Sequence, residues 1–269
     1  MRWLQLNTEQ FRFWNALIEY IEKDSFDLIT MQEVGYWRYS SFDNTLFDPV
    51  ERLALLWYHV AFMPQFILQD EVSKRWNLIA SKYPIIKSGS EYIDWTQSLS
   101  IQTIEQLWLD LDVSLYENRK RKRNLERAIP FGVCYGIFDV WWSQVAVVTI
   151  HLRATPKCRE DEHMKECMSF VLETIKTLWY DKVILTWDCN IQKDADCIKD
   201  ILLQWFEHVN ITHHTTLHPT IHPGFKNDIP PEWYMVDHVF LRWIQLQSYS
   251  IPTVDISDHL PIIYEYKVE

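Results

Sequence analysis

The feature that most constrains the fold is the alternation of short, apolar, strand-like runs with segments whose apolar residues recur at helical spacing. Strand-like runs occur at 2–6, 26–31, 58–68, 77–81, 85–93, 128–139, 144–150, 183–186, 234–241, 245–251 and 260–266. Helical spacing predicts helices at 8–23, from 48 onward, at 98–117, 164–178 and 194–206. Strands and helices that alternate in this way predict an α/β architecture.

Two helix starts can be read directly from the sequence. Thr8 precedes the first predicted helix and is a suitable capping residue for it. Asp48-Pro49-Val50-Glu51 combines an Asp cap, proline at the first helical position and glutamate at the third. We therefore expect one helix to follow Thr8 and another to follow Asp48.

Composition indicates a folded chain that can bury a large core. Of its 269 residues, 48% are hydrophobic and 23% are charged, which is too apolar for a disordered protein. The chain shows neither an internal repeat nor a shift in composition. We therefore predict a single domain over 1–269, with a helical and basic insertion near 98–127.

Glycine is scarce, and its placement excludes two ways of binding a nucleotide. The chain has five glycines, and they form neither GxGxxG nor GxxxxGK[ST]. Rossmann-type dinucleotide binding and P-loop chemistry are therefore excluded, and we expect no nucleotide cofactor. Any phosphate must instead be bound by side chains or by a metal ion.

The net charge and the cysteines limit which partners, cross-links and cellular location can be expected. A formal net charge of -11 weighs against a surface that wraps nucleic acid everywhere, although a local basic groove remains compatible with it. The five cysteines form no CxxC pair, so neither a disulfide framework nor a zinc ribbon is indicated. No apolar run approaches the roughly 20 residues of a membrane span. We expect a cytoplasmic monomer with no stable membrane insertion.

Polar side chains follow the predicted strands repeatedly, at the points where those strands end. These residues are Asn7, Glu33, His151, Asp188, Asn190, Asp237, Asp258 and His259. Strand ends in α/β sheets are where loops converge on a ligand crevice. Carboxylates and carboxamides suit a hard divalent cation such as Mg²⁺, and histidines beside carboxylates suit proton transfer and charge stabilisation.

Taken singly, most of these residues also have a purely structural explanation. Asn7 could be a cap or turn residue, Glu33 a solvated carboxylate, and His151 a buried core histidine; Asp188 and Asn190 could be turn formers. Asp237 is the exception, because a carboxylate within an apolar strand requires a partner. The interpretation of these residues as one site rests on their occurring together, in this order along the chain.

That ordered set resembles the successive motifs of the endonuclease/exonuclease/phosphatase superfamily. The motifs are Leu4-Gln5-Leu6-Asn7, Met31-Gln32-Glu33-Val34, Thr149-Ile150-His151-Leu152, Asp188-Cys189-Asn190, Val236-Asp237-His238-Val239-Phe240 and Ser257-Asp258-His259-Leu260-Pro261. A stretch from Trp76-Asn77 to Pro84 is similar to a further family segment. The resemblance runs from residue 3 to the C-terminus, and its Gln-Glu-Val and Ser-Asp-His pieces are the most specific.

The resemblance implies a four-layered α/β sandwich of two mixed sheets with helices outside, and Mg²⁺-dependent hydrolysis of a phosphoester, with Mn²⁺ as a possible substitute. By the same resemblance, Glu33 would be the main metal ligand, with Asn7 and Asp258 close to the ion. Asp188 would orient and deprotonate the attacking water, Asn190 would hold that water or a phosphate oxygen, and His259, paired with Asp237, would stabilise charge on the phosphoryl oxygens. His151 would bond a phosphate oxygen or assist the leaving group. Asn77 and Arg127 would contact the substrate.

Two positions depart from the family pattern. Trp187 and Trp76 stand where the family usually has glycine, before the Asp188 motif and before Asn77. If those glycines allow close backbone packing, two indoles have to be accommodated beside the site. Every inferred catalytic side chain is nevertheless present.

The substrate class remains open among three alternatives. The basic run at 119–123, with Arg127 beyond it, could bind a nucleic-acid backbone or could be a solvated loop. We expect nucleic acid as substrate; the alternatives are a phospholipid or phosphoinositide headgroup, and an inactive binding module for which Trp187 is the best argument. The histidines at 208, 213, 214, 218 and 222 lack the set needed for zinc, and we expect them to shape the pocket rim.

Overall fold

The computed structural model describes residues 1–8, 13–36, 48–67, 74–93, 131–152, 160–210, 212, 215–222 and 235–268. In chain order its elements are β1 (Arg2–Asn7), α1 (Trp14–Asp24), β2 (Leu28–Tyr36), α2 (Pro49–Leu55), β3 (His59–Ile67), β4 (Lys74–Ser81), β5 (Ile85–Ile93), β6 (Phe131–Val140), β7 (Ser143–His151), α5 (Glu162–Leu178), β8 (Val183–Asp188), α6 (Asp196–Leu202), β9 (Glu207–His208), β10 (Asp237–Arg242), β11 (Gln245–Ser250) and β12 (Ile262–Lys267).

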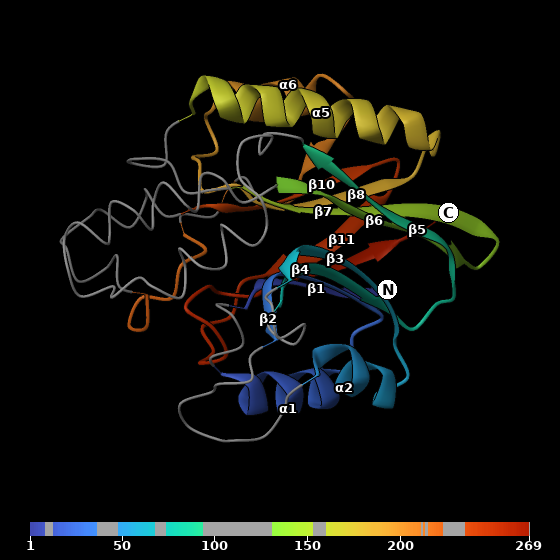
Figure 1. Cartoon of the computed structure of the whole chain (residues 1–269), viewed down its shortest axis with the longest axis vertical. Coiled ribbons are helices and arrows are strands. Elements are labelled where there is room, and N and C mark those ends of the chain that lie inside the picture. Colours follow the sequence, from blue (N-terminus) through green and yellow to red (C-terminus); the bar gives the residue numbers. More distant parts are fainter. Residues whose placement is uncertain are drawn as a thin grey trace.

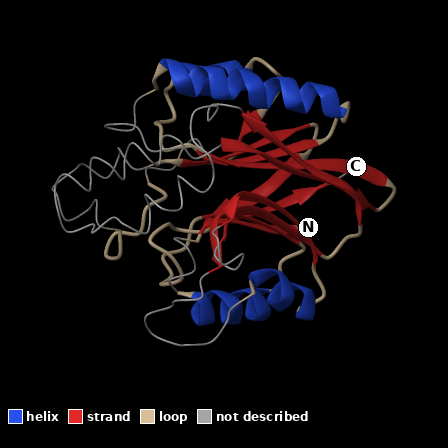
Figure 2. Cartoon of the chain, viewed as in Figure 1, coloured by secondary structure: helices blue, strands red, loops and turns tan. Residues whose placement is uncertain are grey.

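The strands form two mixed sheets of six strands each. One has the order β11-β12-β1-β2-β4-β3 and the other β5-β6-β7-β8-β10-β9. In each sheet one pair is parallel, β1 with β2 and β7 with β8, and the remaining pairs are antiparallel. The sheets stack face to face, with α1 and α2 outside one and α5 and α6 outside the other (Figures 1 and 2). The predicted four-layered sandwich is confirmed.

Three apolar clusters hold these layers together, and strand periodicity decides which residue joins which cluster. Side chains alternate between the two faces of a strand. Trp3 of β1 therefore packs between the sheets, whereas Leu4 and Leu6 pack against α1. In the same way Ile184 of β8 faces the other sheet, and Leu185 faces α5 and α6.

Along several strands the side chains between the two sheets change from apolar to polar towards one edge of the sandwich. The sequence of inward side chains is Trp3, Gln5, Asn7 on β1; Leu28, Thr30, Gln32 on β2; Val147, Thr149, His151 on β7; and Ile184, Thr186, Asp188 on β8. All of them are buried. Because β1 is parallel to β2 and β7 to β8, the polar ends of each pair lie at the same edge.

Hydrogen bonds between the sheets fix this polar edge. Gln32 Nε2 donates to Thr149 Oγ1 at 2.8 Å, and Gln5 Nε2 donates to Asp237 Oδ1 at 3.3 Å. Asn7 Nδ2 donates to Asp188 Oδ2. A buried polar group without a partner costs about 1–3 kcal/mol, so these bonds specify how the two sheets align as well as stabilising them.

The two predicted helix starts have different outcomes. The Asp48 start is confirmed, since its carboxylate accepts from the backbone N–H groups of Val50 and Glu51. The Thr8 cap is wrong: α1 begins at Trp14, and Thr8 Oγ1 instead donates to the carbonyls of Gln32 and Glu33. The interaction that competes with helix capping is a tertiary one, because Thr8 continues the path of β1 beside β2.

Other sequence predictions differ at their boundaries or lie outside the described residues. The helix predicted over 194–206 is confined to α6, and the two-residue strand β9 was missed. The predicted helix at 98–117, the basic run at 119–123 and Arg127 lie outside the described residues, so the single domain with its insertion stays a prediction. No helix in the described part of the chain is both long and apolar enough to cross a membrane.

His208, which we expected at the pocket rim, lies instead in the core against His238. His238 Nε2 is 3.1 Å from the carbonyl of Ile191, so it carries the proton and donates to it. His238 Nδ1 is then the acceptor for His208 Nε2, which lies 3.1 Å away. Burial lowers the pKa of His208 to about 2 and that of His238 to about 4. Both imidazoles are therefore neutral in the folded protein.

This pair predicts a loss of stability in mild acid. Unfolded histidine has a pKa of about 6.5, so below that pH the unfolded chain binds more protons and the free energy of unfolding falls with the pH. In His208→Gln, whose amide can still donate to His238, the loss between pH 7 and pH 5 should be smaller by about 2 kcal/mol than in the original chain. Urea unfolding at a series of pH values measures this; equal losses in both proteins would contradict the prediction.

Candidate functional site

The side chain of Glu33 reaches the polar edge from a β-bulge. The register between β2 and β4 shifts between Met31 and Val34, and Glu33 itself has a φ of 53°. A non-glycine residue in this left-handed region is strained, and such strain persists where surrounding contacts impose it. Here Thr8 Oγ1 holds the bulge through the carbonyls of Gln32 and Glu33. Because of the bulge, two successive residues, Gln32 and Glu33, both have their side chains at the polar edge.

Asp188 lies at the end of β8, where three other polar residues contact it. Its neighbour on β7 is His151, whose Nε2 is 3.7 Å from Asp188 Oδ2 and 3.3 Å from Glu33 Oε1. Asn7 donates to the same carboxylate from the other sheet. The backbone N–H of Asn190 donates to Asp188 Oδ1 at 3.3 Å, and the Asn190 amide donates to the Leu152 carbonyl at 3.1 Å. Asp188 is thus oriented from both sheets.

Asp237 and His259 form a buried pair beside Asp188. Asp237 lies directly opposite Asp188 in the β8–β10 register, and its Oδ2 accepts from His259 Nδ1 at 2.8 Å. Gln5 donates to its other oxygen. The partner that the sequence required for a carboxylate in an apolar strand is therefore His259, with Gln5 in support. Since Nδ1 of His259 is used in this way, Nε2 is the nitrogen left for chemistry.

Asp258 and His222 complete the cluster from two loops. His222 Nε2 lies 3.7 Å from Asp258 Oδ2, and the His222 ring stands nearly perpendicular to that of His259 at 6.0 Å. Two backbone bonds hold these loops together, from His218 N to the Asp258 carbonyl and from Leu260 N to the Thr216 carbonyl, both at 2.7 Å. The residues predicted to shape the pocket rim thus include one, His222, that enters the cluster.

The electrostatics of the site are dominated by buried negative charge. Burial and the charge of Asp237 raise the pKa of Asp188 to about 8, and Glu33 adds to the rise. Burial raises the pKa of Asp258 as well, and Glu33 and Asp237 again contribute. These effects require Glu33 to lie close to both carboxylates, although the three chain segments are far apart in sequence.

His259 is the positive counterpart of these carboxylates. Burial alone would lower its pKa, but the charge and hydrogen bond of Asp237, followed by Asp188 and Asp258, raise that pKa well above its usual value. The same contact holds the pKa of Asp237 below its usual range despite burial. Burial lowers the pKa of His222 to about 4, so His222 is neutral and adds no charge. One imidazolium faces four carboxylates.

The cluster fits a divalent cation. A ligand atom of Asp188 lies within 4.8 Å of one of Asp237, and a ligand atom of the neutral His222 lies within 4.8 Å of one of Asp258; the imidazolium of His259 is near both pairs. Asp258 Oδ1 is buried and has no hydrogen-bond partner among the described residues, and its contact with His259 Nε2 is long, at 4.0 Å. A buried carboxylate oxygen among like charges is stabilised when a cation joins it. Glu33 belongs to neither pair, although its charge acts on Asp188 and Asp258.

Of the two predicted substrate contacts, the structure describes Asn77 only. Asn77 lies on β4 opposite the Glu33 bulge, between Trp76 and Leu78, which pair with Val34 and Met31. It is fully buried, and its amide oxygen and nitrogen lack hydrogen-bond partners among the described residues. Such an orphaned amide beside the cluster suits a bound ligand or water. Arg127 lies outside the described residues.

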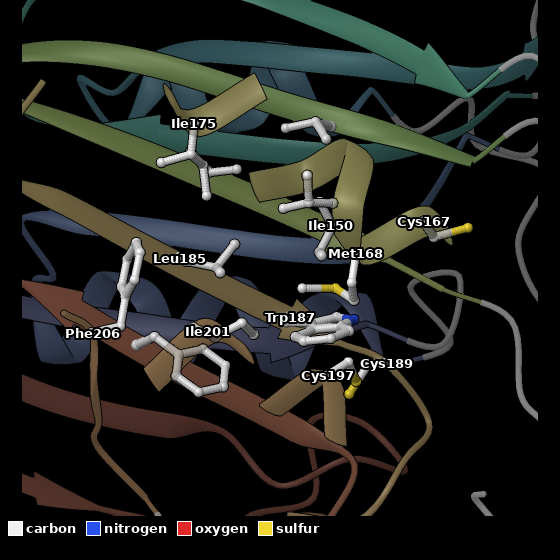
Figure 3. Close-up of a cluster of buried hydrophobic side chains, with 14 of the residues drawn as sticks. Ile150, Cys167, Met168, Ile175, Leu185, Trp187, Cys189, Cys197, Ile201 and Phe206 are labelled. Carbon is white, nitrogen blue, oxygen red and sulfur yellow. The ribbon is translucent and has the colours of Figure 1, made fainter. Parts of the chain in front are cut away.

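Trp187 does not intrude on the cluster. Strand alternation turns its side chain to the opposite face of β8 from Asp188, where it is fully buried with Ile150, Met168 and Cys197 under α5 and α6 (Figure 3). The indole is therefore part of the hydrophobic core and does not enter the site. The side chain of Trp76 is outside the described residues.

Sequence reasoning missed several residues that support the site. Gln5, Gln32, Thr149 and Thr216 contact the cluster or the residues beside it, and His222, which we expected at the pocket rim, enters the cluster itself. For Gln5, Gln32 and Thr149 a signal was available, namely a polar residue at an inward position of an otherwise apolar strand. Thr216 had none, because its contact with Asp237 N depends on the path of the loop.

The arrangement can now be compared with known structures. No family model matches the sequence, and no curated protein matches it either. The structure, however, superposes over 100% of its length on the endonuclease/exonuclease/phosphatase protein from Beutenbergia cavernae, covering 71% of that chain with a TM-score of 0.68 at 16% identity. The fold is that of the endonuclease/exonuclease/phosphatase proteins.

Two further solved structures agree with this fold. The mannosyl-6-phosphatase of Bacteroides thetaiotaomicron is 13% identical, with a TM-score of 0.65 and 100% of each chain covered. The catalytic domain of human Nocturnin with a bound sulfate anion is 12% identical, with a TM-score of 0.63 and 99% and 93% covered. At such low identity the likeness shows the fold alone, and it confirms the fold that the sequence motifs implied.

The Asp237–His259 contact gives a prediction that needs no substrate. In Asp237→Asn the carboxylate that most raises the pKa of His259 is gone, so that pKa should fall by more than one unit, measured by NMR titration of the imidazole in the presence of a chelator. Asp255→Asn is the matched control, because Asp255 is exposed and contacts His218 instead. An unchanged pKa of His259 in Asp237→Asn would refute the assignment.

The buried negative charge predicts opposite effects of one substitution with and without metal. In chelator, Asp258→Asn should raise the melting temperature, because the raised pKa of Asp258 means that its charge disfavours folding. With Mg²⁺ at about 100 times its dissociation constant the original chain should gain about 3 kcal/mol, and Asp258→Asn should lose most of this gain. Glu173→Gln, at an exposed position of α5, serves as the control. No Mg²⁺-dependent gain in the original chain would contradict a cation site.

Proposed function

We propose that this chain is a divalent-metal-dependent phosphodiesterase that acts on nucleic acid, as a nuclease or a nucleic-acid-end-processing enzyme. The observation that carries the proposal is the meeting of Glu33, Asp188, Asp237 and Asp258 with one protonated histidine, His259, at a single edge of the sandwich. Hydrolysis of a phosphoester needs a cation, a general base and a group that stabilises negative charge, and this cluster offers all three.

In this proposal Glu33 and Asp258 hold the cation, with Asn7 beside it. Asp258 brings an oxygen that has no hydrogen-bond partner among the described residues, and Glu33 brings a charge that acts on Asp258 and Asp188. A bound Mg²⁺ or Mn²⁺ would supply Lewis-acid polarisation of the phosphoryl oxygens. Carboxylate and carboxamide oxygens are the ligands that both ions accept.

Asp188 is the proposed general base. It is buried, and its raised pKa of about 8 makes its ionised form a stronger base towards water than an ordinary carboxylate. Asn7 and the Asn190 backbone fix its two oxygens, so its orientation is set before substrate binds. Asn190 follows in a left-handed conformation that turns its side chain back towards Leu152. We assign Asn190 the positioning of the water or of a phosphate oxygen.

His259 and His151 are the proposed stabilisers of the phosphoryl group. His259 is held as an imidazolium by Asp237, with Nε2 as its available donor. His151 lies between Glu33 and Asp188 and can bond a phosphate oxygen or assist the leaving group. A fixed cationic donor in a buried site stabilises developing charge more strongly than the same group in water.

The substrate assignment draws on the sequence and on the names of fold neighbours. The basic run at 119–123 suits a phosphate backbone, and one neighbour is described as an endonuclease/exonuclease/phosphatase. A sugar phosphate is the second candidate, because another neighbour is a mannosyl-6-phosphatase and the cluster fits a terminal phosphate equally well. We further propose that the chain acts as a cytoplasmic monomer.

A substrate panel tests the proposal. Single-stranded, duplex, abasic and 5′-blocked oligonucleotides, mannose 6-phosphate, sphingomyelin and phosphoinositides are each offered with Mg²⁺ or with EDTA. Oligonucleotides should be hydrolysed only with Mg²⁺. In Glu33→Ala and in His259→Ala the kcat should fall at least 100-fold, as for loss of a group that stabilises the transition state.

Controls separate the alternatives. Glu173→Gln should retain full activity, because it lies on the exposed surface of α5. Turnover of the sugar phosphate or of a lipid alone would overturn the nucleic-acid assignment and keep the phosphoesterase. No turnover of any substrate by a folded, Mg²⁺-binding protein would favour a binding module.

A further inference from the structure

Two opposite environments occur among the tryptophans of the described residues, and Trp14, which is half-buried on α1, belongs to neither. Trp3 is fully buried between the sheets and stacks on Tyr264 at a centroid distance of 5.0 Å, as is usual for this residue. Six others are 63–98% exposed and have φ between 48° and 72°. They are Trp57, Trp141, Trp142, Trp179, Trp205 and Trp243.

This second group contradicts the conformational preference of tryptophan. Positive φ occurs in only a few per cent of non-glycine residues, mostly Asn and Asp, and for a bulky side chain it is an outlier. Nine non-glycine residues in the described part of the chain have positive φ, and six of them are tryptophan. No glycine there has positive φ, although glycine adopts it without cost. Tryptophan occupies the positions that suit glycine.

The end of α2 shows this most clearly. Trp57 N bonds to the Ala54 carbonyl at 3.0 Å and Tyr58 N to the Leu53 carbonyl at 3.1 Å, which together form a Schellman motif. In that motif the left-handed residue is usually glycine, and here it is Trp57 with 86% of its surface exposed. α5 also ends at a left-handed tryptophan, Trp179, whose N–H bonds to the Lys176 carbonyl at 3.2 Å.

The hairpin between β6 and β7 repeats the pattern with two adjacent residues. Val140 pairs with Ser143, so Trp141 and Trp142 form a two-residue turn in which both have positive φ. This is the type I′ turn, which strongly prefers Asn-Gly or Gly-Gly. Trp142 is 98% exposed, so its indole gains almost nothing from packing.

An aromatic docking surface does not explain the whole set. Trp179, Trp205 and Trp243 do line one hollow with Arg242, and the last two stack at 6.5 Å. Such a surface would account for exposure, but it would not require left-handed backbone. It also leaves out Trp57 at the end of α2 and the hairpin turn. Backbone conformation is the property that all six share.

The composition of the chain agrees with this pattern. The sequence contains 14 tryptophans and only five glycines. A low glycine count and a high tryptophan count are what a systematic exchange of one residue for the other would produce.

We propose that glycine stands at the six left-handed positions in the protein as its own cell makes it, because the codon there is read as glycine. UGA is such a codon: different genetic codes read it as stop, tryptophan or glycine, whereas UGG means tryptophan. Trp3 is then encoded by UGG.

Mass spectrometry of the protein purified from the organism that encodes it tests this directly. Peptides that span the six left-handed positions should have the mass expected for glycine, and the peptide with Trp3 should have the mass expected for tryptophan. The gene should carry UGA at the former positions and UGG at the latter. Tryptophan masses at the left-handed positions would overturn the inference and leave an exposed aromatic surface. Neither result depends on catalytic activity.

Recombinant variants test the physical basis separately. Replacing the six left-handed tryptophans with glycine should raise the melting temperature by about 2 °C or more per position. The matched control replaces the same six with alanine, which removes the indole but keeps the Cβ that opposes positive φ. Equal melting temperatures for the two variants, or a lower one for the glycine variant, would contradict the argument from backbone conformation.

Discussion

Negative charge buried between two sheets is the constraint on which the rest of this structure depends. Asp188, Asp237 and Asp258 are almost fully buried, Glu33 acts on two of them, and among the described residues His259 opposes them with a positive charge. Like charges in a region of low polarity repel strongly. The fold keeps them together because each belongs to an element that is fixed by its own hydrophobic face. The energy of the core thus holds together an arrangement of carboxylates that a bound cation would stabilise.

The strand pattern explains how one core can serve both purposes. On β1, β2, β7 and β8 the inward positions are apolar at one end and polar at the other. The same face of each strand therefore forms the core at one end and the site at the other. Hydrogen bonds from Gln5, Gln32 and Asn7 cross between the sheets at the polar end. A shift of either sheet by one residue would separate these pairs and expose the apolar face. Alignment of the sheets and geometry of the cluster are therefore the same property.

Much of the fold could be predicted because strand and helix periodicities are local. The Asp48 cap, the long helix α5 and most strands follow from patterns within about ten residues. The errors arose where distant contacts compete with local preference: Thr8 bonds to β2 rather than capping a helix, and His208 pairs with His238 in the core rather than facing the pocket. The six left-handed tryptophans are the reverse case, in which local chemistry disagrees with a backbone that the fold imposes.

The sequence by itself determined which residue types would form the site and in what order, because the motifs Gln32-Glu33-Val34 and Ser257-Asp258-His259 are contiguous. It also determined that Asp237 must have a partner. The resemblance also paired Asp237 with His259, and the structure has this contact. Only the tertiary structure decided that Gln5 supports the pair, that Glu33 acts on Asp188 and Asp258, and that His222 joins them. The physical reason is that such contacts depend on sheet packing and loop paths, which no short stretch of sequence encodes.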